Sequence, residues 1–150
     1  MIQNTSVTSR KIAICCLAMI IGLWIVGVAS GEILRHLIQT SPIWIGVVLG
    51  FRNSQWTKSA ALPFFIFWFA IMTLIWLFLL GWSRIVRGHY SPTEIAMTIV
   101  IGAAALVGII FCARMKTPIK FIQAAAVFVL TALAQYVAMY VSLLPQFRSR

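Results

Sequence analysis

Apolar residues occur in long uninterrupted blocks along the chain, and polar residues are confined mainly to the short stretches between them. A helix needs about 20 apolar residues to cross the hydrocarbon core of a bilayer. Four blocks reach this length and predict transmembrane helices over residues 12–31, 60–82, 92–113 and 118–143. The pattern predicts an all-α integral membrane protein, with residues 1–150 forming a single bundle of about four transmembrane helices.

The first block directly follows Arg10 and Lys11, so it also has features of a secretory signal peptide. The sequence VGVAS before Gly31 would then be the cleavage site. The apolar run is longer than the roughly 7–15 residues of a signal peptide's apolar region. We therefore expect a retained first span, with cleavage as the alternative.

The stretch between the first two blocks combines an amphipathic part with a short apolar part. Over residues 32–40, Glu32, Arg35 and Gln39 can lie on one side of a helix and the apolar residues on the other. Ser41 is then a suitable N-cap for a short apolar helix that ends near Phe51.

Residues 42–51 cover only about half of a membrane crossing at the usual rise per residue. We expect residues 32–51 to form an interfacial helix that leads into a short or re-entrant helix. The alternative is a fifth, tilted span over residues 31–51, which would place Arg35 and His36 inside the membrane at a cost in free energy.

A helix-start motif precedes the third block. Ser91, Pro92 and Glu94 form the pattern S-P-x-E. In this capping box the serine hydroxyl oxygen accepts the backbone N–H of Glu94, and the Glu94 carboxylate accepts the backbone N–H of Ser91. A negative charge in the first turn also suits the helix dipole. We predict that Glu94 caps this helix, with proton or cation binding near His89 or Tyr90 as the alternative.

The second acidic residue, Glu32, has partners at helical spacing. Arg35 and His36 follow it by three and four residues and can meet it on one helix face. We expect an interfacial ion pair. A carboxylate–histidine pair that titrates near neutral pH is the alternative.

Composition supports the membrane assignment. The chain is 62% hydrophobic and only 9% charged, whereas soluble domains are about 25% charged. The net charge of +10 is spread in small groups between the apolar blocks. Scattered basic groups favour contact with anionic lipid head groups over nucleic-acid binding, which needs a basic face.

The distribution of Lys and Arg between loops bears on orientation, because basic loops stay in the cytoplasm. With four spans the two sides hold six basic residues each, a tie that is also compatible with dual insertion. With five spans the count is seven against five and favours a cytoplasmic N-terminus.

Several spans carry small residues four apart, which lets helix backbones approach closely. We expect these small residues to pack helices together: Gly27, Gly31, Gly46, Gly50, Ala104 and Gly108. Thr131 and Gln135 form part of a mildly polar stripe on the fourth span. We expect them to hydrogen-bond to a neighbouring helix, with the lining of a solute pathway as the alternative.

The sequence has no pattern that identifies an enzyme. Nucleotide-binding, nucleophile and metal-binding motifs are absent. Cys15, Cys16 and Cys112 lie in apolar blocks without metal spacing. In the four-span arrangement, His36 and His89 fall on opposite sides, which disfavours a shared haem. We expect no catalytic, metal or cofactor site.

These observations favour a non-enzymatic protein of the bacterial inner membrane. It would act as an accessory or scaffolding subunit that binds another membrane protein, or it would bind itself. The alternative is a small oligomeric transporter or channel for a solute or ion.

Overall fold

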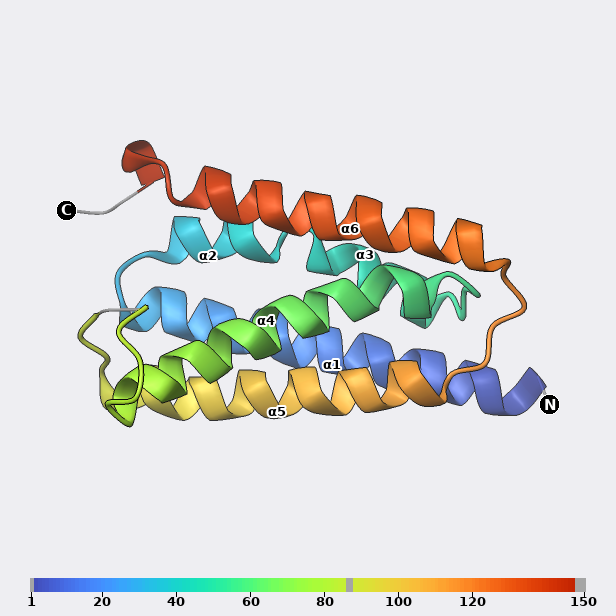
Figure 1. Cartoon of the computed structure of the whole chain (residues 1–150), viewed down its shortest axis with the longest axis horizontal. Coiled ribbons are helices and arrows are strands. Elements are labelled where there is room, and N and C mark those ends of the chain that lie inside the picture. Colours follow the sequence, from blue (N-terminus) through green and yellow to red (C-terminus); the bar gives the residue numbers. More distant parts are fainter. Residues whose placement is uncertain (1, 86–87, 148–150) are drawn as a thin grey trace.

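The computed structural model describes residues 2–85 and 88–147, and within them it contains helices and no strands. The helices form one elongated bundle (Figure 1). They are α1 (Ile2–Ala29), α2 (Ile33–Thr40), α3 (Ile43–Phe51), α4 (Thr57–Leu79), α5 (Pro92–Arg114) and α6 (Phe121–Ser142), followed by a short 3₁₀ turn (Pro145–Phe147). Four of them, α1, α4, α5 and α6, are long and apolar enough to cross a membrane. The prediction of an all-α membrane bundle is confirmed.

Except at the start of α1, the helix ends differ from the apolar blocks by a few residues. α1 begins at Ile2, far before the expected residue 12, because a helix can continue beyond its apolar part. α4 is shifted towards the N-terminus relative to residues 60–82, and α6 begins at Phe121 instead of residue 118. Gly31 and Gly81 follow α1 and α4 with φ values of +72° and +78°. This left-handed conformation favours glycine and ends both helices.

Residues 33–51 form a bent pair of helices, α2 and α3, with an angle of 50° between them. By length and composition the pair fits either one broken span or a re-entrant loop. In Figure 1, however, it runs from one end of the bundle to the other, so that α3 ends where α4 begins. This course supports the fifth span, which we had placed second to an interfacial and re-entrant segment.

The break between α2 and α3 is compensated by side-chain hydrogen bonds. Ser41 Oγ donates to the carbonyl of Ile38 at 2.8 Å, and Thr40 Oγ1 donates to the carbonyl of His36 at 2.9 Å. Gln135 Nε2, from α6, donates to the Gln39 carbonyl at 3.1 Å. These bonds matter because hydrocarbon supplies no water to a backbone group that a helix break leaves unpaired.

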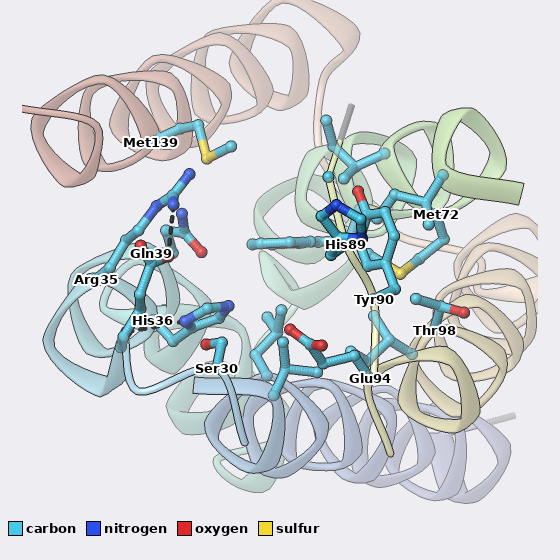
Figure 2. A pocket seen from close by; sticks show the side chains of 18 residues that line it. Ser30, Arg35, His36, Gln39, Met72, His89, Tyr90, Glu94, Thr98 and Met139 are labelled. Carbon is cyan, nitrogen blue, oxygen red and sulfur yellow. Dashed lines mark hydrogen bonds and ion pairs between the residues drawn. The ribbon is translucent and has the colours of Figure 1, made fainter. Parts of the chain in front are cut away.

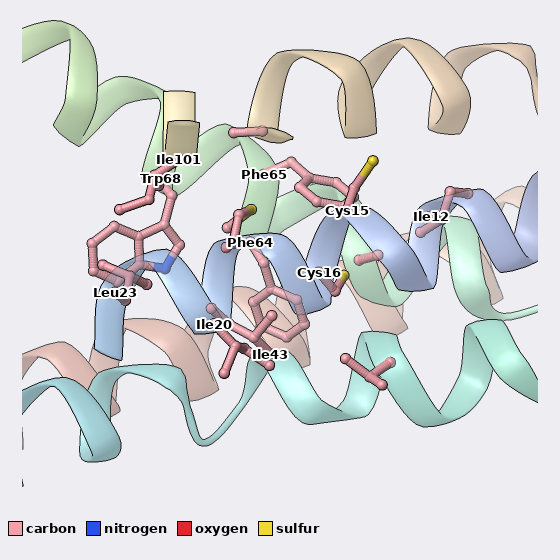
Figure 3. Packing of buried hydrophobic residues seen from close by; sticks show 14 of the residues in the cluster. Ile12, Cys15, Cys16, Ile20, Leu23, Ile43, Phe64, Phe65, Trp68 and Ile101 are labelled. Atoms are coloured by element: carbon pink, nitrogen blue, oxygen red, sulfur yellow. The ribbon is translucent and has the colours of Figure 1, made fainter. Parts of the chain in front are cut away.

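The core is built around α1, which packs against α2, α3, α4 and α5. Half of its apolar stretch is buried, compared with 17% for α6. Residues of α1, α3 and α4 interlock in this core (Figure 3). α1 is therefore the central helix of the bundle.

Small residues allow close packing at several helix contacts. A Cβ added at Gly50 would lie 2.7 Å from the Ala13 Cβ, and one at Gly46 would lie 2.9 Å from the Cys16 sulfur. A Cβ added at Gly108 would lie 2.5 Å from the Phe65 ring.

The other three small residues that we expected to pack helices differ among themselves. An added Cβ at Gly27 would lie 3.0 Å from the His36 Cβ, and Ala104 packs at the edge of the core. Gly31 does not pack, contrary to expectation. It lies in the turn after α1, with no atom within 4 Å of an added Cβ.

We predict that Gln135→Leu destabilises the protein because it leaves the buried Gln39 carbonyl without its side-chain donor. The expected loss is about 1 kcal/mol of unfolding free energy, or about 2–4 °C in melting temperature. A thiol-reactive dye can follow unfolding in detergent, because Cys15, Cys16 and Cys112 are buried.

The control is Gln123→Leu, the same change at an exposed position of the same helix. An equal or higher melting temperature for Gln135→Leu than for Gln123→Leu would contradict the prediction.

Candidate functional site

A cavity of about 490 Å³ lies at the end of the bundle where α1 ends and α5 begins. We call it the end cavity (Figure 2). Its walls come from α1, α2, α4, α5, α6 and the segment before α5. Its polar rim contains both acidic residues and both histidines of the chain: Glu32, Glu94, His36 and His89, together with Arg35 and Tyr90.

The α2 wall carries an ion pair and a histidine. Arg35 Nη1 donates to Glu32 Oε2 at 2.6 Å, the interfacial pair that the spacing predicts. His36 Nδ1 lies 3.0 Å from the backbone carbonyl of Glu32. The hydrogen bond of His36 is thus to the backbone carbonyl of Glu32, whereas the Glu32 carboxylate accepts from Arg35.

The opposite wall is formed by the start of α5, where the predicted capping box is present. The Ser91 N–H donates to Glu94 Oε2 at 2.6 Å, and the Glu94 N–H donates to Ser91 Oγ at 3.3 Å, with Pro92 as the first helical residue. In Figure 2 the Glu94 carboxylate points into the cavity towards His36. Glu94 therefore both caps the helix and presents a charge to the cavity.

Tyr90 contributes an aromatic ring to the rim. Its ring contacts Phe78 at a centroid distance of 6.1 Å. Burial raises the pKa of the Tyr90 phenol, and the nearby negative charge of Glu94 raises it further. Tyr90 is therefore a neutral hydrogen-bond donor at neutral pH.

The inner part of the cavity is apolar. Its lining includes Leu23 and Val26 of α1, Trp68 and Ile75 of α4 and Ile101 of α5. Beyond this floor the core is tightly packed, and Phe64, Phe65 and Ile43 are fully buried (Figure 3). The cavity thus has a polar rim and an apolar floor, and a packed layer separates it from the other end of the bundle.

The residues singled out in the sequence fall into two groups. Glu94 lines the end cavity, whereas Thr131 and Gln135 lie outside its lining. Thr131 Oγ1 donates to Val127 of its own helix, and Gln135 bonds to α2, which is the helix-to-helix role expected of it.

Sequence reasoning missed that both histidines line one cavity. His36 and His89 were assigned to opposite sides because α2 and α3 were not expected to cross the membrane. Because α2 and α3 run along the bundle from one end to the other, the two residues meet at the same end. Among the described residues, no group of three or more His, Cys, Asp and Glu side chains is placed to hold a metal ion.

Comparison with known protein families, curated proteins and solved structures gave no match. Function is therefore argued from the end cavity itself.

Proposed function

We propose that this protein is a non-enzymatic membrane protein that binds a small organic molecule in the end cavity. The observation that carries the proposal is the cavity's composition: it gathers both carboxylates and both histidines around an apolar floor. Its volume of about 490 Å³ lies in the range of about 300–1,000 Å³ typical of small-molecule sites, which combine apolar walls with a few polar groups.

The packed layer below the cavity favours binding over conduction. Phe64 and Phe65 are fully buried there, so an open channel would require these side chains to separate. A carrier that exposes the same site alternately to the two sides is compatible with this geometry. We therefore place binding of a small molecule first; a carrier would be one form of the transporter expected as the alternative, and a channel would not.

We predict that Val26→Trp, which fills the cavity floor, abolishes binding of a small aromatic ligand such as 2-phenylethanol. At a ligand concentration of ten times the Kd, binding should stabilise the wild-type protein by about 1.4 kcal/mol. The measurement is the ligand-dependent melting temperature, and the variant should show no such shift.

Val28→Trp is the matched control, because Val28 is 71% exposed on the same helix and lies outside the cavity lining. It should keep the wild-type shift. The proposed function fails if 2-phenylethanol and its charged analogues leave the wild-type melting temperature unchanged.

We also propose that the protein lies in a bacterial inner membrane with the end cavity facing away from the cytoplasm. Of the nine described Lys and Arg residues, seven lie at the end opposite the cavity: Arg10, Lys11, Arg52, Lys58, Arg114, Lys116 and Lys120. Basic ends stay in the cytoplasm and contact anionic lipids. The other two, Arg35 and Arg84, lie at the cavity end.

This orientation predicts opposite labelling of two introduced cysteines. Ile85→Cys, at a position 78% exposed at the cavity end, should react with a membrane-impermeant maleimide in intact cells whose outer membrane admits the reagent. Lys116→Cys should react only after the inner membrane is opened. The native cysteines give little background because they are buried. The reverse pattern would contradict the proposed orientation.

An accessory or self-associating role is the second candidate. The observation that favours it is the position of α6, which is the least buried of the long helices and exposes Tyr136 and Tyr140. Tyrosine is enriched at protein interfaces.

This second role predicts that the protein, extracted gently from its own membrane, has a native mass above that of one chain. Tyr136→Ala together with Tyr140→Ala should reduce that mass without lowering the melting temperature. A single-chain mass for the wild type would exclude stable association.

A further inference from the structure

The end cavity places two hydrogen-bond acceptors opposite each other. His36 Nδ1 lies 3.0 Å from the Glu32 carbonyl, and because a carbonyl only accepts, Nδ1 is the donor. In a neutral histidine the other ring nitrogen, Nε2, is then an acceptor. The ring points into the cavity towards Glu94, whose carboxylate also only accepts (Figure 2).

The charged side chains that line the cavity, taken over the described residues, are unbalanced. Arg35 is engaged by Glu32 in an ion pair at 2.6 Å. Within residues 2–85 and 88–147, no cationic side chain lies within ion-pair distance of Glu94. Apart from the histidines, the lining carries two negative charges, on Glu32 and Glu94, and one positive charge, on Arg35.

A carboxylate that faces an apolar cavity is stabilised by a cation with donors. A protonated amine provides both, since its three N–H groups can reach Glu94 and His36 together. The Tyr90 ring on the same rim offers an aromatic face to the cation.

The apolar floor of the cavity indicates the chemical character of the rest of the ligand. Leu23, Val26, Met72, Ile75 and Ile101 offer apolar contacts, and Trp68 offers an aromatic one. A bare inorganic cation would leave this surface unused, and an anion would face the Glu94 carboxylate.

We propose that the end cavity binds a small molecule with a primary ammonium group and an apolar, aromatic body. The ammonium lies between Glu94 and His36, and the body lies against Trp68. This inference rests on the proposed function, because it names the ligand of the same cavity.

The test compares three ligands that share a phenyl ring and a short chain but differ in charge. These are 2-phenylethylamine, which is protonated at pH 7, 2-phenylethanol and 3-phenylpropanoate. Their Kd values are obtained from the melting temperature of the purified protein over a concentration series. We expect the amine to bind at least tenfold more tightly than the alcohol, and the acid to bind more weakly than the alcohol.

Glu94→Gln should remove the preference for the amine, so that the Kd values of the amine and the alcohol for this variant lie within about twofold of each other. The variant is suited to the test because Gln also serves in a capping box, so the start of α5 is kept. His36→Gln provides a second variant, and it should reduce the preference severalfold.

The outcomes separate the two proposals. If the alcohol or the acid binds as tightly as the amine, or if Glu94→Gln keeps the preference, the ammonium assignment is wrong while the binding function stands. If none of the three ligands binds to the wild type, both proposals fail.

A free aromatic amine is the ligand that we propose, but the ethanolamine head group of a membrane lipid also carries a primary ammonium group and has to be distinguished from it. Vesicles of phosphatidylglycerol alone and of phosphatidylglycerol with phosphatidylethanolamine distinguish them. A lipid ligand should stabilise the wild type more than Glu94→Gln and should weaken the effect of 2-phenylethylamine. If phosphatidylethanolamine stabilises the wild type and Glu94→Gln equally, the site is assigned to a free amine.

Discussion

The hydrogen bond from Gln135 to the Gln39 carbonyl is the contact on which the rest of the arrangement depends. A helix that breaks inside a membrane exposes backbone groups that lipid cannot satisfy. Here the Gln39 carbonyl near the break accepts a hydrogen bond from the Gln135 side chain of α6. The Gln39 side chain in turn donates to Ser142 Oγ at 3.0 Å. The two bonds fix α6 against α2, and they make a bent crossing compatible with a hydrocarbon environment.

The bent crossing in turn creates the end cavity. Because α2 and α3 together run the length of the bundle, the polar first turns of α2 lie at the same end as the start of α5. Glu32, Arg35 and His36 therefore face Glu94 across a space that apolar residues of α1 and α4 close from below. The charged groups stay near the end of the bundle, where the cost of placing charge in a membrane is lowest.

Features set by local sequence could be predicted, and those set by packing could not. The long spans follow from length and hydropathy alone, and the Ser91–Glu94 cap follows from residues three apart. The course of residues 33–51 along the bundle could not be deduced, because their polar side chains are compensated by partners about 100 positions away in the chain, such as Gln135 and Ser142. The end cavity was missed for the same reason, since its two walls meet only once that course is known. Gly31 was misassigned because a turn glycine and a packing glycine look alike in a spacing pattern.

The eight residues of α2 form a short helix between two breaks in the helical backbone. One break is the glycine turn at Gly31, and the other is the bend at Ser41. The walls from α1, α4 and α5 belong to continuous helices with residues in the apolar core, whereas α2 is held by side-chain hydrogen bonds to α6. A tilt of α2 about the two breaks changes the width of the cavity rim and leaves the packed layer around Phe64 in place. Such a tilt has to stretch the two side-chain bonds to α6, so the position of the wall that carries Arg35 and His36 depends on a helix that contributes none of the described residues of the apolar core cluster.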